Sequence, residues 1–102
     1  MRMILFYDLP MNKKNLVKTY NQFRNKLLKE GFVLVQYSVY SKICINEESM
    51  NRLVSRIEKI KPSEGNIRAM IVTEKQYAKM IFFNGKKSLQ EKESNDRRLV
   101  IY

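Results

Sequence analysis

Several kinds of residue are scarce in this chain of 102 residues. It has no histidine, no tryptophan, one cysteine, two prolines and three glycines. The absence of histidine excludes imidazole as a general acid or base and as a metal ligand. The single Cys44 cannot form an internal disulfide, and its apolar neighbours in the sequence predict a small core residue.

Long hydrophobic runs are also missing. No stretch reaches the roughly 20 apolar residues that a membrane-spanning helix needs, and the apolar run after Arg2 ends at Asp8, too early for a signal peptide. We therefore expect a cytoplasmic protein with no membrane as partner. The length fits a single small domain, to which association between copies would add buried surface.

Negative charge is the third scarcity. The chain has 10 Asp and Glu residues against 20 Lys and Arg residues, which gives a formal net charge of +10. The cations are spread along the chain rather than gathered in one tail. We therefore expect a polyanionic partner, and nucleic acid fits better than a membrane surface or a charge that serves solubility alone.

One of only two aspartates follows the apolar segment that opens the chain. Residues 3–7 are apolar at successive positions, which is typical of a central strand in a sheet covered on both faces, and Pro10 stops the strand. Asp8 is thus placed at the carboxyl end of the strand, where open sheets often carry functional groups. It is our candidate for a catalytic and metal-binding residue. The alternative is a turn residue that accepts backbone N–H bonds.

The residues after Pro10 predict one helix and then two strands. Apolar residues recur at helical spacing from Asn12, a good N-cap, as far as Gly31, which ends the pattern. Two apolar runs rich in β-branched residues follow at 32–35 and 39–45, and each predicts a strand. No glycine or proline lies between the two runs, so the hairpin that would join them is not marked.

The next part of the chain predicts a second helix and a further strand. Residues 47–61 are amphipathic, with glutamates in the first turn and lysines in the last turn, which complements the helix dipole. A strand is predicted over 67–73, a short helical turn from the capping-box pattern at 73–76, and extended chain over 80–83. This order of elements predicts an α+β fold, the ferredoxin-like βαββαβ sandwich with two helices on one face of an antiparallel sheet.

The end of the chain contains residues beyond those that the βαββαβ fold needs. We assign residues 1–85 to the ferredoxin-like domain, residues 86–96 to a polar connector and residues 97–102 to an extra C-terminal strand. The apolar residues of this strand are Leu99, Val100 and Ile101. Such a strand covers an edge of its own sheet or crosses to a partner. We predict exchange with the partner in a twofold homodimer rather than a purely internal strand.

Two pairs of lysines are the first candidates for nucleic-acid binding. Lys13 and Lys14 follow the first strand, and Lys86 and Lys87 follow an Asn-Gly turn, so all four can reach phosphates from exposed positions. The secondary candidates are Arg24, Ser38, Arg52 and Arg56. A stripe such as that of Arg52 and Arg56 is most often only a solvated helix face, Arg24 is similarly ambiguous, and an ordinary polar turn explains Ser38 at least as well. Aromatic residues do not alternate with the cations, which favours contact with a duplex backbone over base stacking on a single strand.

Four segments of the chain, in order, carry a family resemblance. They are MRMILFYDLP at the start, EGFVLVQYSVYSK at 30–42, GNIRAMIVTEKQYAKMI at 65–81 and RRLVIY at the end. Together they resemble the small CRISPR-associated adaptation proteins of the Cas-two family, particularly its type II-like members. The resemblance implies a ferredoxin-like homodimer that bridges dimers of the CRISPR integrase, the Cas-one family, and binds duplex spacer-precursor DNA. In family members, basic pairs at positions matching the lysine pairs contact the DNA backbone.

The same resemblance implies a metal-dependent endonuclease that acts on RNA or DNA. In that description the aspartate ending the first strand, here Asp8, binds Mg²⁺ or Mn²⁺ together with its symmetry mate. The residues by themselves make this site lean, because one carboxylate holds magnesium poorly, although two carboxylates at a twofold axis can share one ion. Whether the protein is an enzyme, a magnesium-dependent phosphodiester hydrolase, is left open. The alternatives are a free-standing endoribonuclease or toxin-like nuclease of the same fold and a basic RNA-binding module.

Overall fold

The computed structural model describes residues 1–9 and 14–91 of the chain. The elements are β1 (Arg2–Asp8), α1 (Lys14–Lys29), β2 (Val33–Gln36), β3 (Val39–Ile43), α2 (Glu47–Ile60), β4 (Asn66–Val72) and α3 (Glu74–Ala78). Both long helices, the four strands of the basic plan and the short helical turn are therefore confirmed. The prediction of extended structure over 80–83 is wrong in that no strand forms there, because these residues have no neighbouring strand with which to pair.

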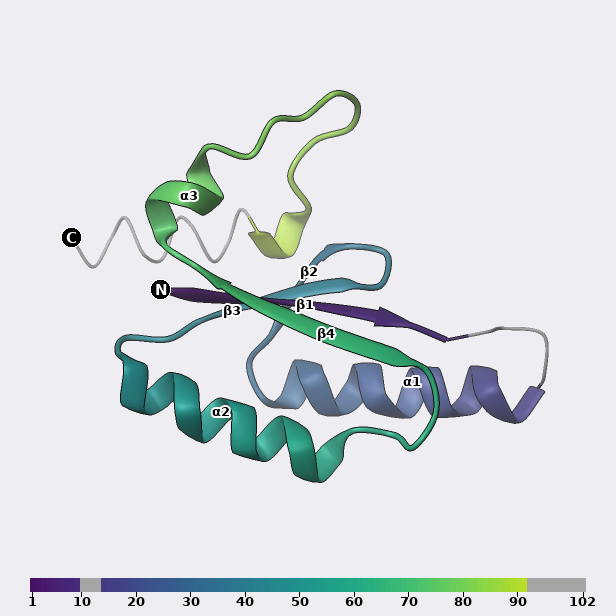
Figure 1. The fold of residues 1–102 in the computed structure, drawn as a ribbon. Coiled ribbons are helices and arrows are strands. Elements are labelled where there is room, and N and C mark those ends of the chain that lie inside the picture. The colour runs from purple at the N-terminus through teal and green to yellow at the C-terminus, as the bar shows by residue number, and fades with distance from the viewer. Residues whose placement is uncertain (10–13, 92–102) are drawn as a thin grey trace.

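The four strands form one antiparallel sheet in the order β2-β3-β1-β4. Both α1 and α2 lie on one face of this sheet, as Figure 1 shows. This arrangement is the ferredoxin-like α+β fold that the order of elements predicted. None of the helices in the described part of the chain is long and apolar enough to span a membrane.

The core lies between the helices and one face of the sheet. Alternate side chains of β1 enter it, and Tyr7 packs edge-on against Phe23 of α1 with ring centroids 4.8 Å apart. The fully buried Leu53 contributes from α2, and Cys44 is buried and free of a disulfide, as predicted. The helical spacing of the apolar residues in the sequence therefore brought them to the face that contacts the sheet.

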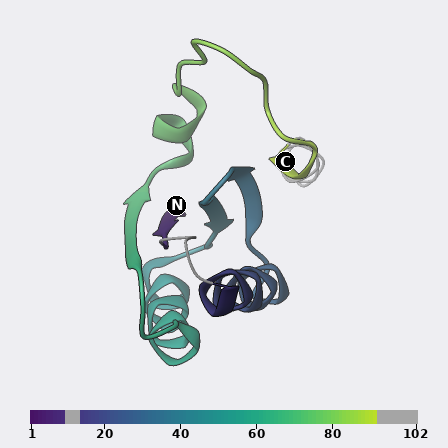
Figure 2. The same ribbon diagram turned by 90° about the vertical axis from the view of Figure 1, so that its right-hand side faces the viewer.

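The predicted burial of β1 on both faces holds for only part of the strand. On the face away from the helices, Arg2 and Ile4 are buried, whereas Phe6 is 38% exposed and Asp8 is exposed. The difference arises because α3 and the chain after it form an arch over this face, as Figure 2 shows, and their contacts reach only the start of β1. The carboxyl end of the strand is left open.

The chain after α3 returns to the outer strand β2. The Ser88 hydroxyl donates a hydrogen bond of 2.6 Å to the backbone oxygen of Leu34, and the backbone N–H of Leu34 donates one of 2.6 Å to the Gln90 side-chain oxygen. These bonds satisfy two backbone groups of an edge strand that would otherwise be open to pairing. The predicted connector, residues 86–96, is described as far as residue 91, and the predicted strand at 97–102 lies outside the described residues.

Candidate nucleic-acid and metal site

Asp8 lies where the sequence placed it, at the carboxyl end of β1 on the open face of the sheet. The strand register sets Asp8 opposite Asn66 of β4 and sets Phe6 opposite Arg68, so these four side chains share one face. Arg68 is an exposed cation that the sequence analysis did not select. Only the register between two strands far apart in the sequence brings it close to the aspartate.

A glycine of the loop between α2 and β4 packs directly against the backbone of Asp8. A Cβ atom on Gly65 would lie 2.8 Å from the carbonyl oxygen of Asp8, and Gly65 has a φ of +91°. Both features require glycine, because an L side chain would collide with the strand and would strain the backbone. No local pattern in the sequence signals this close approach.

The turn between β2 and β3 lies at the same end of the sheet. The backbone N–H of Tyr7 donates a hydrogen bond of 2.9 Å to the carbonyl oxygen of Ser38, and the hydroxyls of Ser38 and Tyr20 share a bond of 3.1 Å. Ser38 has a φ of 65° and so adopts the left-handed conformation for which a tight hairpin usually needs glycine. The candidate Ser38 therefore has a structural role in this turn.

Tyrosine hydroxyls continue this network into the core. The hydroxyls of Tyr20 and Tyr40 are 3.4 Å apart, and burial together with that hydrogen bond raises the pKa of Tyr40 well above its usual value. Burial also raises the pKa of Tyr7. With a raised pKa, Tyr7 and Tyr40 stay protonated and neutral near pH 7, so these two residues do not supply a charge for catalysis.

The acidic residues that the structure describes do not form a metal centre within a single chain. Within residues 1–9 and 14–91, no group of three or more His, Cys, Asp or Glu side chains lies close enough to hold an ion. Asp8 therefore offers one carboxylate on an open surface. This donor set fits Mg²⁺ only as half of a site that a second copy completes, since a hard cation needs several oxygen ligands.

The structure places only one of the two predicted lysine pairs. Lys86 and Lys87 are exposed in the segment on the open face of the sheet, whereas α1, which begins at Lys14, lies on the other face, as Figure 1 shows. Lys13 and the side chain of Lys14 lie outside the described residues. The exposed pair and the start of α1 therefore lie on opposite faces of the sheet within a single chain.

The secondary arginine candidates differ in their partners. Arg56 forms an ion pair with Glu30 at 2.7 Å, and Arg52 forms one with Glu48 at 3.1 Å on the exposed side of α2. Arg24 is half-buried on α1 and has no ion-pair partner among the described residues. Its charge is therefore more available to an added anion than the charges of the two arginines on α2.

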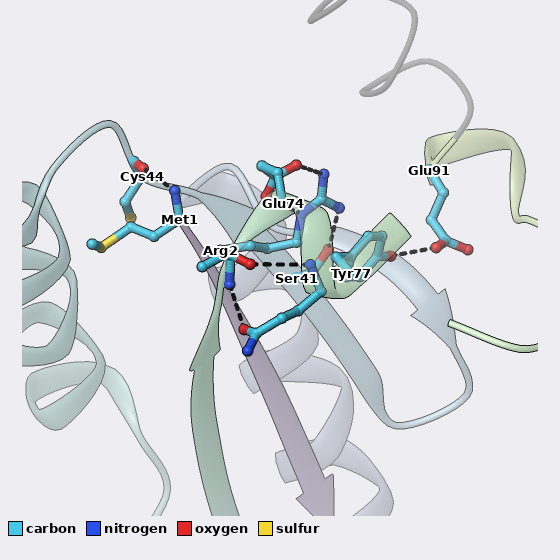
Figure 3. Close-up of polar contacts among 9 residues, drawn as sticks. Met1, Arg2, Ser41, Cys44, Glu74, Tyr77 and Glu91 are labelled. Carbon is cyan, nitrogen blue, oxygen red and sulfur yellow. Dashed lines mark hydrogen bonds and ion pairs between the residues drawn. The ribbon is translucent and has the colours of Figure 1, made fainter. Parts of the chain in front are cut away.

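A polar cluster under the arch joins β1 to α3 and was not foreseen from the sequence. The buried guanidinium of Arg2 donates two hydrogen bonds to the Glu74 carboxylate, at 2.9 and 2.7 Å, and lies 3.8 Å from the ring centroid of Tyr77. The Tyr77 hydroxyl in turn donates to Glu91, which is buried (Figure 3). Burial and this hydrogen bond raise the pKa of Tyr77 to about 12. The cluster joins α3 and residues 88–91 to the start of β1, and three of its four side chains, those of Arg2, Tyr77 and Glu91, are buried.

Comparison with known proteins agrees with the resemblance seen in the sequence. Residues 1–80 match the model of the family described as CRISPR associated protein Cas2, the Cas-two family named above. The chain is also similar to proteins named CRISPR-associated endoribonuclease Cas2. One, from Ligilactobacillus salivarius, is 40% identical over 99% of this chain and 100% of its own length. Others come from Treponema denticola, at 45% identity over 99% of both chains, and from Streptococcus mutans, at 43% identity over 98% of this chain and 91% of the relative.

Proposed function

Because this chain belongs to the CRISPR-associated Cas2 family, we propose that it acts in CRISPR adaptation as a homodimeric scaffold. In this role it bridges dimers of the integrase, the Cas-one family, and binds duplex spacer-precursor DNA. The observation that carries the proposal is the net charge of +10 on a small fold whose exposed loops include Lys86 and Lys87. Cations in such positions bind the phosphate backbone without reading the bases.

The open face of the sheet supports the homodimer. Phe6 is 38% exposed and Met70 is 51% exposed, and the register places Met70 of β4 beside Ile4 on the same face. Covering these side chains in a second copy removes apolar surface from water at roughly 25 cal/mol for each Å². A twofold interface on this face would also bring two copies of Asp8 toward each other.

A secondary endonuclease activity follows from the same arrangement. The Asp8 carboxylates of two copies would hold Mg²⁺ or Mn²⁺, and a bound ion supplies a Lewis acid that activates water against a phosphodiester. The relatives named above carry the name endoribonuclease, which supports this activity and keeps a free-standing endoribonuclease as the alternative function. Cleavage depends on the carboxylate of Asp8, whereas bridging of the integrase dimers depends only on the surfaces of the protein.

Replacement of Asp8 tests the order of these two roles. In Asp8→Ala, cleavage that depends on magnesium or manganese should be lost, while new spacers are still integrated in an acquisition assay in cells. Asn66→Ala is the matched control, because it changes the side chain opposite Asp8 without removing a carboxylate. If Asp8→Ala stops integration while the variant still dimerises and still binds the integrase, the scaffold is not the main function.

A further inference from the structure

We propose that a pocket between α1 and the β2–β3 turn binds one unpaired nucleobase of a nucleic-acid strand, with the adjacent phosphate on Arg24. This inference rests on the proposed function as a nucleic-acid-binding protein and adds a subsite for an unpaired nucleotide. The pocket has a volume of about 310 Å³. It is lined by Tyr20, Asn21, Arg24, Leu34, Tyr37 and Tyr40. The volume lies at the lower end of the range of about 300–1,000 Å³ for small-ligand sites, which suits a single base.

Three tyrosine rings form a stack that runs from the core to this pocket. The rings of Tyr7 and Tyr20 are 5.2 Å apart at an interplanar angle of 8°, and those of Tyr20 and Tyr37 are 5.7 Å apart at 20°. The first two residues are buried, whereas Tyr37 is 70% exposed. A flat aromatic ring at the end of such a stack offers a platform for a base, and stacking of a base on an aromatic side chain contributes about 1–3 kcal/mol.

The turn that carries Tyr37 is held in place before any ligand arrives. Ser38 adopts a φ of 65°, which is unfavourable for a residue with a side chain. The bonds from Ser38 to the Tyr7 backbone and to the Tyr20 hydroxyl maintain it. Because the ring is already positioned, little conformational entropy is lost when a base binds.

The charges around the pocket favour a nucleotide over an aromatic side chain of a protein. Among the residues that the structure describes, Arg24 lines the pocket without an ion-pair partner and no acidic residue lines it. The exposed amide of Asn21 can donate to and accept from the edge of a base, and Leu34 supplies an apolar wall. An aromatic side chain would use the stacking surface alone, whereas a nucleotide also uses the cation and the amide.

The test compares a blunt duplex with the same duplex that carries an unpaired thymine tail containing 2-aminopurine. We expect the wild-type protein to bind the tailed duplex more tightly and to quench the 2-aminopurine fluorescence. Tyr37→Ala should weaken binding of the tail by roughly 5- to 150-fold and abolish the quenching, while affinity for the blunt duplex stays unchanged. Tyr37→Phe keeps the stacking ring and should behave as the wild type.

Arg24→Gln tests the phosphate contact. It should weaken binding of the tail and reduce the slope of log affinity against log salt by about 0.7 for the single-stranded contact. Arg52→Gln is the matched control, because that cation already pairs with Glu48. Circular dichroism of each variant verifies the fold.

The outcomes separate this inference from the proposed function. A tail that adds no affinity, or a Tyr37→Ala variant that still binds and quenches the tail as the wild type does, overturns the nucleobase pocket. If Arg24→Gln weakens binding of the tail but Tyr37→Ala does not, the site is only a surface cation, and the nucleobase pocket is likewise overturned. A protein that binds the tail through Tyr37 but does not bind the blunt duplex contradicts the duplex scaffold and leaves the pocket standing.

Discussion

Because Gly65 has no side chain, its loop can pack directly against the backbone of the candidate residue Asp8. In Gly65→Ala the new Cβ would meet the carbonyl oxygen of Asp8 at 2.8 Å, and alanine would have to adopt a φ of +91°. We expect the free energy of unfolding to fall by about 1–3 kcal/mol. Urea denaturation measures the effect.

The control for this variant is Gly85→Ala, where φ is +86° and no heavy atom lies within 4 Å of the added Cβ. Gly85→Ala therefore has the strain of a positive φ but lacks the close contact that the added Cβ makes in Gly65→Ala. Equal midpoints for Gly65→Ala and Gly85→Ala would show that the close approach to Asp8 costs nothing.

The raised pKa of Tyr77 predicts that the protein loses stability at alkaline pH. Its pKa is raised from 10.0 to about 12, mainly by burial and to a smaller extent by the hydrogen bond to Glu91. The folded state therefore retains the phenol proton more strongly than the unfolded state. The resulting stability is fully present below about pH 10 and is lost as the pH rises toward about 12. Urea denaturation of the wild type and of Tyr77→Phe across this range measures it.

Comparison with Tyr77→Phe removes the contribution of lysine titration, which the two proteins share. The phenylalanine variant should be less stable near neutral pH, because it lacks the hydroxyl that donates to the buried Glu91, and the difference between the two proteins should shrink as the pH rises. A constant difference from pH 8 to pH 12 would contradict the assignment.

At the scale of elements, the two edges of the sheet differ. The edge strand β2 has backbone groups of Leu34 bonded by Ser88 and Gln90, whereas β4 at the other edge carries the exposed Met70 and Ile71. An edge with exposed apolar side chains is a template for a further strand. The sequence offers such a strand at 97–102, which remains a prediction because those residues lie outside the described part of the chain.

Removal of that strand tests its role. If the protein is the proposed homodimer, deletion of residues 97–102 should yield a monomer or lower the free energy of unfolding, because the predicted apolar strand no longer packs against the partner. Multi-angle light scattering and urea denaturation measure the two effects. Leu89→Ser is the control, since Leu89 is 77% exposed and lies before the strand. A truncated protein that stays a dimer of full stability would rule out the exchange.

At the scale of the whole molecule, the charge predicts how DNA binding responds to salt. Binding of duplex DNA should not depend on base sequence and should weaken steeply with salt. Replacement of Lys13, Lys14, Lys86 and Lys87 by glutamine should flatten the slope of log affinity against log salt by roughly 0.9 for each phosphate that the variant no longer neutralises. Fluorescence anisotropy at several salt concentrations measures the slope.

The matched control replaces Arg52 and Arg56 by glutamine, because both arginines already pair with acids. We expect the slope to stay close to that of the wild type in this control. The reverse result, with no change in the lysine variant and a flatter slope in the arginine variant, would move the binding face to α2.

The helices and strands and their order along the chain could be predicted from local patterns of residues. The capping box at the start of α2 is local, since Asn46 and Ser49 bond to each other across one turn, and the apolar spacing of α1 reports a single buried face. The position of Asp8 at the end of β1 was equally local, because it depends on the strand that precedes it and not on distant residues. Patterns of this kind can be read from neighbours in the chain.

Contacts between residues far apart in the sequence could not be predicted in this way. The burial of Arg2 by Glu74, the approach of Gly65 to Asp8 and the placement of Arg68 beside Phe6 all depend on strand register and loop path. The stacking of Tyr37 on Tyr20 joins a turn to a helix. No local pattern encodes such contacts, because their free energy comes from packing between segments that become neighbours only when the sheet has formed.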